Sequence, residues 1–110
     1  MLIKFQKILA EAIIPHYAHP GDAGMDIFSV EEIIIKEGEI KNVRTGVKME
    51  LPEGYAGLVW DKSGLALKNG IKTMAGVIDA GYRGEIEIVL INLSEKDYKV
   101  EKGQKISQML

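Results

Sequence analysis

The fold is decided between residues 76 and 91, where the sequence reads Gly76-Val-Ile-Asp-Ala-Gly-Tyr-Arg-Gly-Glu-Ile-Glu-Ile-Val-Leu-Ile91. Two glutamates, Glu85 and Glu87, alternate with isoleucines before the pattern becomes wholly apolar. This change is typical of a strand that leaves a half-exposed position and enters a core covered on both faces. Residues 77–78 close a preceding strand. The glycines between the two strands predict a hairpin whose tip leaves backbone amides and carbonyls free.

Shorter segments on the N-terminal side extend this pattern. Residues 33–35 and 55–60 are rich in β-branched, apolar and aromatic side chains, which predicts two further strands. Residues 63–70 contain good helix formers, with Ser63 as the expected N-cap and Gly70 as the C-terminal stop. A helix of two turns is too short to stand alone. The sequence therefore predicts an all-β barrel or sandwich with one short helix.

The composition fits one small globular domain over residues 1–110. The net charge of −2 lacks the basic surplus of a nucleic-acid binder, so no nucleic-acid partner is expected. The longest uninterrupted apolar run, Ile88 to Ile91, is far short of a membrane span, so no membrane partner is expected either. The chain has no cysteine, which excludes disulfides and thiolate metal sites. The first residues lack the apolar region of a signal peptide, and we expect a cytoplasmic protein.

The start of the expected helix is a candidate phosphate site. A strand ends at Trp60, and the pair Ser63-Gly64 opens the helix, so free backbone amides with partial positive charge point outward. Lys62 adds a full charge beside them. A serine cap next to a solvated lysine explains the same residues equally well.

Two other loops carry candidate functional residues that also have an ordinary structural explanation. Asp26, in Ala23-Gly-Met-Asp-Ile27, suits a metal ion, although an aspartate in a glycine-containing loop is more often a turn former. Asp79 and Tyr82 could be a solvated carboxylate and a packed ring on a decorated hairpin. Gln108, at the end of a strand that follows a turn, is almost uninformative alone.

Read in order, four stretches resemble the motifs of the trimeric dUTPase (deoxyuridine triphosphatase) family. They are Ala23 to Ile27, Lys62 to Ala66, Ala75 to Gly84 and Gly103 to Gln108. The resemblance implies a β-rich jelly-roll subunit, a homotrimer and active sites at the subunit interfaces. It also implies hydrolysis of dUTP to dUMP and pyrophosphate with Mg²⁺ on the triphosphate, for nucleotide-pool sanitation and dUMP supply.

The third stretch would bind the nucleoside. By resemblance, Gly76, Val77 and Ile78 read uracil through their backbone. Tyr82 lies against the deoxyribose, where its ring would crowd a 2′-hydroxyl and exclude UTP. Asp79 orients and deprotonates the water that attacks the α-phosphorus.

The remaining stretches would bind the triphosphate and its metal. By resemblance, Asp26 holds Mg²⁺ through bound waters, and the phosphates contact Lys62, Ser63 and the Gly64 amide. Gln108 donates a neutral hydrogen bond to a phosphate oxygen.

Three departures from the family pattern keep alternatives open. Lys62 replaces the usual arginine and loses its bidentate fork. Asp61 places a carboxylate beside the phosphate site, which is tolerable if it points away. The chain stops at Leu110, so we expect it to lack a C-terminal strand and the glycine-rich fifth motif that closes over substrate.

Two rival functions share this fold. A dCTP deaminase, or a bifunctional relative, places a catalytic glutamate where this chain has Val89, with Glu87 two residues away. A catalytically weak nucleotide-binding module is the other, supported by Lys62 and the absent fifth motif.

Overall fold

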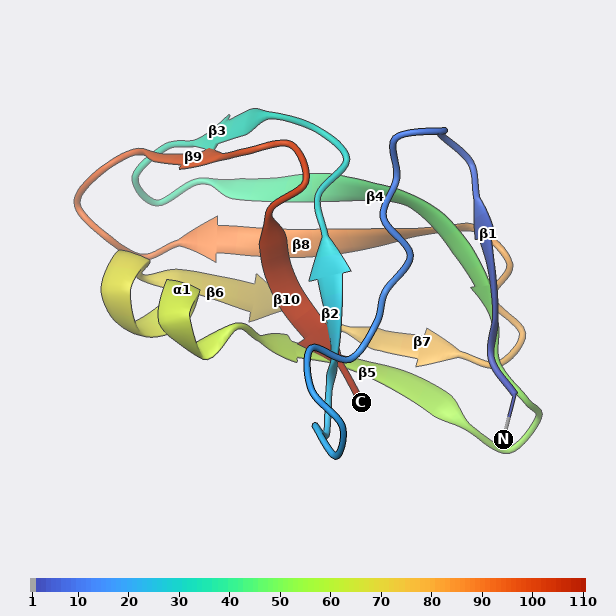
Figure 1. Ribbon diagram of the computed structural model, residues 1–110. Coiled ribbons are helices and arrows are strands. Elements are labelled where there is room, and N and C mark those ends of the chain that lie inside the picture. Colours follow the sequence, from blue (N-terminus) through green and yellow to red (C-terminus); the bar gives the residue numbers. More distant parts are fainter. Residues whose placement is uncertain (1) are drawn as a thin grey trace.

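The computed structural model describes residues 2–110 and contains ten strands and one short helix in that range (Figure 1). In chain order the elements are β1 (Lys4–Lys7), β2 (Met25–Phe28), β3 (Ile33–Ile35), β4 (Ile40–Glu50), β5 (Ala56–Asp61), α1 (Ser63–Asn69), β6 (Ile71–Met74), β7 (Val77–Asp79), β8 (Glu85–Asn92), β9 (Tyr98–Val100) and β10 (Lys105–Met109). The prediction of an all-β fold with one short helix is confirmed.

The strands form two four-stranded sheets and one two-stranded ribbon. The sheet orders are β1-β4-β8-β6 and β2-β10-β5-β7, and the ribbon pairs β3 with β9. Every pairing is antiparallel. In Figure 1, β2 and β10 cross in front of the sheet that holds β8 and β6. The chain therefore forms the two-layered sandwich of a jelly roll.

The core lies between the two sheets. It draws Val43, Ile88 and Leu90 from one sheet and Ile27 and Ile106 from the other, all within one hydrophobic cluster. Burying an aliphatic side chain of this size contributes about 1.5–3 kcal/mol relative to exposure. The small core thus holds both layers, and with them the loops at their edges.

The strand predicted from residue 85 onward is confirmed as β8, a central strand between β4 and β6. Its isoleucines Ile86 and Ile88 are buried, as the alternation predicted, while Val89 on the opposite face is only half-buried. The second face is therefore partly covered rather than fully enclosed.

The predicted hairpin between residues 77 and 86 is wrong. β7 pairs with β5 in one sheet, whereas β8 pairs with β4 and β6 in the other. Residues 80–84 therefore cross from one sheet to the other. Alternation shows which side chains face the core, but it does not identify the neighbouring strand.

The helix begins at Ser63 itself, so its N-cap lies one residue earlier than predicted. Lys62 occupies the N-cap position without a side-chain capping bond, and Ser63 is the first helical residue. The predicted role of Ser63 as N-cap is therefore wrong, because the Lys62 carbonyl accepts the first helical bond, from Ala66 N–H at 3.0 Å. Gly70 ends the helix as predicted, with a left-handed φ of 66°. No helix within residues 2–110 is long and apolar enough to cross a membrane.

Candidate functional site

A pocket of about 310 Å³ opens beside β7 and β8. Its lining contains all five residues that the resemblance assigns to the nucleoside and the attacking water: Gly76, Val77, Ile78, Asp79 and Tyr82. Sequence reasoning missed other lining residues, which come from β4, β5, β6 and β8. They include Asn42, Val59, Thr73, Met74 and Ile88. These residues carry no local motif, and it is strand pairing that brings them to the pocket.

The backbone around Gly76 is held close to β5. Val59 N–H donates to the Gly76 carbonyl at 2.7 Å. Gly76 has a φ of 114°, and a Cβ there would lie 2.7 Å from the Val59 carbonyl oxygen. A glycine is therefore required for this approach.

The edge strand β7 presents an unpaired backbone edge. It is the last strand of its sheet, and its hydrogen-bonded neighbour in that sheet is β5. An edge strand leaves a row of N–H and C=O groups available to another molecule. The backbone of residues 76–78 can thus pair with a planar group that carries donors and acceptors.

Tyr82 and Asp79 lie at the end of this edge. Tyr82 N–H donates to the Asp79 carbonyl at 3.1 Å, which forms a tight turn. The Tyr82 hydroxyl donates to the Glu85 carbonyl at 2.6 Å, and 45% of the residue is exposed. Asp79 is exposed and contributes to the pocket lining. The turn therefore places a ring and a carboxylate in one pocket.

A second group of predicted residues lies on β2, β10 and the end of β5. We call Asp26, Lys62, Lys105 and Gln108 the charged cluster. Gln108 on β10 lies opposite Asp26 on β2 and Trp60 on β5, so three adjacent strands bring these positions together. Ser63 and Gly64 follow Lys62 at the start of α1, and both are exposed.

Asp26 is the centre of the charged cluster. Its side chain is only 5% exposed, and its Oδ1 accepts a hydrogen bond from Lys62 Nζ at 3.1 Å. Oδ2 lies 3.1 Å from Lys105 Nζ, in a geometry that does not align as a hydrogen bond. Burial alone would raise the pKa of Asp26, but the two lysines outweigh burial and lower that pKa. Asp26 is thus held as a carboxylate.

Lys105 was missed by sequence reasoning. It comes from the stretch that ends in Gln108, but a lysine on a strand carries no signal of its partner. Its ion pair with Asp26 exists because β10 lies directly beside β2.

The Gln108 side chain is held by one hydrogen bond and accommodated by a glycine. Its Nε2 donates to the Asp61 carbonyl at 2.9 Å, which leaves its second N–H for another acceptor. A Cβ at Gly24 would lie only 3.1 Å from the Gln108 Cδ, so Gly24 makes room for this side chain.

The Asp61 carboxylate is bound by β6. Its Oδ2 lies 2.7 Å from Lys72 Nζ, and its Oδ1 accepts the Thr73 N–H at 2.5 Å. Burial alone would raise the pKa of Asp61, but Lys72 and the Thr73 amide lower it. These contacts satisfy the carboxylate that the sequence placed beside the expected phosphate site.

The charged cluster and the pocket are separate within one chain. The pocket lining contains none of the predicted triphosphate and metal residues Asp26, Lys62, Ser63, Gly64 and Gln108. One chain therefore presents two partial sites with different chemistry: a neutral pocket with a backbone edge, and a surface with two ammonium groups.

Comparison with known proteins gives a consistent assignment. A family model described as dUTPase matches residues 10–110. The deoxyuridine 5′-triphosphate nucleotidohydrolase of Clostridium novyi is 52% identical over 112 residues, covering 100% of this chain and 79% of the relative. The enzyme of the same name from Clostridioides difficile is 49% identical over 110 residues, covering 98% of this chain and 77% of the relative.

Solved structures agree with these relatives. A dUTPase from phage phi11 of S. aureus, described as coordinating a structural Mg(II) ion, has a TM-score of 0.95 at 26% identity. The match covers 100% of this chain and 89% of the phage protein. A Staphylococcus bacteriophage 80alpha dUTPase variant with dUpNHpp has a TM-score of 0.95 at 29% identity, covering 99% of this chain and 80% of that one.

Proposed function

This chain belongs to the dUTPase family, and we propose that it hydrolyses dUTP to dUMP and pyrophosphate. The observation that carries the proposal is the pocket, in which one unpaired strand edge, Tyr82 and Asp79 meet. The reaction would remove dUTP from the nucleotide pool and supply dUMP, and we place it in the cytoplasm.

The base and sugar would bind along β7. Uracil carries both donors and acceptors on one edge, which suits the backbone groups of residues 76–78 that β5 leaves unpaired. The Tyr82 ring would lie against the deoxyribose and leave no room for a 2′-hydroxyl. The close approach at Gly76 supports this placement, because it fixes the strand edge against β5.

Asp79 would activate the attacking water. The water oxygen forms a bond to the α-phosphorus, its proton passes to the Asp79 carboxylate, and the bond to the bridging oxygen breaks. Pyrophosphate then leaves with the bond electrons. A positioned general base typically contributes about 10²- to 10⁴-fold to the rate.

The triphosphate would bind at the charged cluster. Lys62 supplies a full charge, Ser63 a hydroxyl, Gly64 a backbone amide and Gln108 a neutral donor. Lysine binds phosphate as a point charge, without the planar fork of arginine. In this structure Lys62 contacts Asp26, so binding to a phosphate would exchange or share that contact.

A hydrated Mg²⁺ fits the charged cluster through Asp26. Within residues 2–110 no group of three His, Cys, Asp or Glu side chains could hold a metal by itself. Mg²⁺ usually keeps several waters and binds one or two carboxylates together with substrate phosphates. The buried Oδ2 of Asp26 accepts no hydrogen bond, and a metal-bound water would reach it by displacing the Lys105 ammonium that lies 3.1 Å away. When bound, the ion would neutralise charge on the phosphate oxygens.

We further propose a homotrimer with active sites at subunit interfaces. The support is the separation of the pocket from the charged cluster, which leaves each chain with two incomplete sites. An exposed apolar row on β5, Leu58 and Trp60, offers surface for a neighbouring copy. A pocket from one subunit would then face the charged cluster of another.

Asp79→Asn tests the mechanism. The substitution keeps the size and removes the base, so pyrophosphate release from dUTP should fall at least about 100-fold while dUMP binding by calorimetry is largely kept. Asp97→Asn is the matched control and should leave turnover unchanged, because Asp97 is exposed in the loop before β9 and asparagine keeps the oxygen that accepts the Glu37 N–H. Undiminished turnover in Asp79→Asn would remove Asp79 from the mechanism.

The same assays separate the rival functions. Glu87 and Val89 both line the pocket, so dCTP is tested as a second substrate. Ammonia release from dCTP would identify a deaminase. A wild-type chain that binds dUMP but releases neither pyrophosphate nor ammonia would identify a nucleotide-binding module.

A further inference from the structure

The pairing between β4 and β8 is interrupted beside the pocket. Arg44 lies opposite Glu87 and Lys48 lies opposite Glu85, so residues 45–47 of β4 oppose residue 86 alone. Gly46 has a left-handed φ of 70° at this point. The extra residues form a bulge, which breaks the regular ladder of backbone hydrogen bonds.

Side chains replace the missing ladder bonds. The Thr45 hydroxyl donates to the Ile86 carbonyl at 2.6 Å, and Val47 N–H donates to Thr45 Oγ1 at 3.3 Å. Gly46 N–H donates to the Glu85 carboxylate at 2.9 Å. The bulge therefore depends on Glu85, the first residue of β8.

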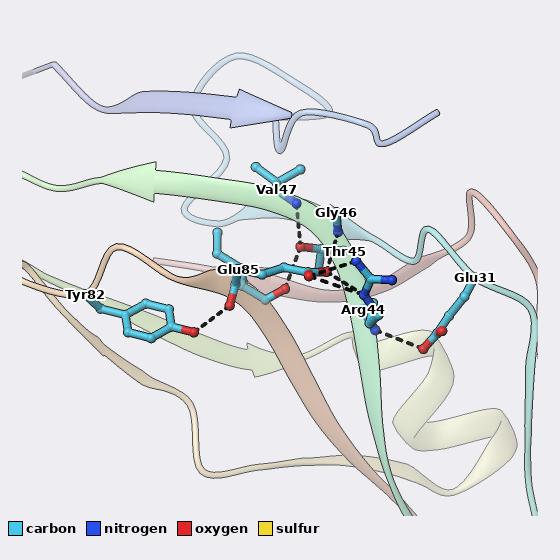
Figure 2. A network of polar contacts seen from close by, with 8 residues as sticks. Glu31, Arg44, Thr45, Gly46, Val47, Tyr82 and Glu85 are labelled. Carbon is cyan, nitrogen blue, oxygen red and sulfur yellow. Dashed lines mark hydrogen bonds and ion pairs between the residues drawn. The ribbon is translucent and has the colours of Figure 1, made fainter. Parts of the chain in front are cut away.

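Arg44 holds the same carboxylate. Its Nε lies 3.2 and 3.1 Å from the two Glu85 oxygens, and its terminal Nη2 lies 3.0 Å from Oε1. The Glu85 side chain is 16% exposed, so this fork binds a largely desolvated charge. The Arg44 backbone N–H in turn donates to Glu31 (Figure 2).

The backbone carbonyl of Glu85 binds Tyr82, a residue that lines the pocket. This carbonyl accepts the Tyr82 hydroxyl at 2.6 Å, and Figure 2 shows this bond on the opposite side of Glu85 from Arg44. The Tyr82 ring also packs over Gly84, where a Cβ would lie 2.6 Å from the hydroxyl oxygen. Glu85 thus connects Tyr82 to the bulge of β4 through two separate groups.

We infer that Arg44 is a positioning residue for Tyr82, and that the Arg44–Glu85 pair sets how strictly the pocket excludes a 2′-hydroxyl. The inference rests on the proposed function. Tyr82 lies on the crossing loop between two sheets and is half-exposed, so its ring depends on the anchor at Glu85. Loss of the fork frees the start of β8, and the ring gains room to accept a ribose.

The test is a double-mutant cycle of Arg44→Met and Tyr82→Phe. The measured quantity is the ratio of kcat/KM for dUTP to kcat/KM for UTP, with dUMP and UMP affinities by calorimetry as the readout without turnover. Arg44→Met should lower the ratio about 2- to 10-fold, the span of one hydrogen bond. Tyr82→Phe keeps the ring but removes the link to Glu85, so Arg44→Met should then change the ratio no further.

Controls separate positioning from general destabilisation. Lys99→Met removes a different cationic side chain, one that pairs with Glu32 and Glu101 on the surface, and should leave the ratio unchanged. Arg44→Lys keeps the charge and should restore part of the ratio. Arg44→Met leaves the Glu85 carboxylate buried and unpaired, which could prevent folding. In that case the double variant Arg44→Met/Glu85→Gln, which lacks the buried charge, replaces Arg44→Met in the cycle.

The outcomes are distinct. Equal ratios in wild type and Arg44→Met, or an equal fall with and without the Tyr82 hydroxyl, would overturn the inference while leaving the proposed function intact. A wild-type chain that neither hydrolyses dUTP nor binds dUMP would overturn the proposed function, and the inference with it.

Discussion

Replacing Asp26 by asparagine should cost the protein stability at neutral pH and almost none in acid. The side chain is 5% exposed and lies 3.1 Å from each of two ammonium groups, those of Lys62 and Lys105. Asparagine has the same shape and keeps an acceptor oxygen, so the substitution removes mainly the charge.

The magnitude follows from the exposure of the two lysines. A hydrogen bond to a charged group contributes about 1.5–3 kcal/mol. The Lys62 and Lys105 side chains are 36% and 45% exposed, so water rehydrates both ammonium groups once the carboxylate is gone. The large penalty for orphaning a buried charge therefore does not apply, and we expect a loss of about 1–2 kcal/mol in the free energy of unfolding.

The pKa of Asp26 determines how the stability difference between wild type and Asp26→Asn changes with pH. Burial alone would raise the pKa of Asp26, but the lysines lower it in the folded state. The stabilisation is therefore complete above the unfolded pKa of about 3.9 and is lost as pH falls through the lower folded value. The difference between wild type and Asp26→Asn should shrink once the pH falls below about 4.

Urea unfolding in metal-free buffer at a series of pH values measures this difference. Glu53→Gln is the matched control, because it removes one negative charge from an exposed turn. It should change stability by less than about 0.5 kcal/mol. An Asp26→Asn deficit that stays constant from neutral pH to about pH 3 would refute the ion-pair account.

Two further substitutions test the candidate site and the buried hydrogen bonds of the fold. Gly24→Ala places a Cβ against the Gln108 side chain, so it should displace that amide and lower kcat/KM for dUTP. The free energy of unfolding should fall by only about 1 kcal/mol. Activity equal to wild type would argue against a role for Gln108. Asn92→Leu removes a fully buried amide that donates to the Ile35 and Lys96 carbonyls, and urea unfolding should show a loss of about 3–5 kcal/mol. A loss below about 1 kcal/mol would mean that water satisfies those carbonyls.

Local sequence was sufficient where local physics decides the outcome. The alternation at residues 85–88 predicted a strand with buried isoleucines, and β8 confirms it. Gly70 was expected to end the helix because a left-handed residue suits glycine, and its φ of 66° agrees. The N-cap was misplaced by one residue, since helix ends depend on the path of the preceding strand.

The candidate site was predictable only as a set of positions. Motif order selected Asp26, Lys62, Asp79 and Tyr82 as candidates, without any information on the distances between them. The structure adds the Lys105 contact with Asp26 and the link from Tyr82 through Glu85 to the bulge of β4. These contacts join residues far apart in the chain, and no periodicity encodes them.

By itself, the sequence determined that the chain forms short strands around a small apolar core and carries four ordered motifs. Those features depend on side-chain type and on spacing along the chain. The tertiary structure decided that β7 pairs with β5 rather than β8, which leaves its outer edge unpaired in its sheet, where we propose that the base binds. It also decided that Asp26 lies between two lysines. Strand pairing and ion pairing are interactions through space, so they are fixed only once the two sheets have packed.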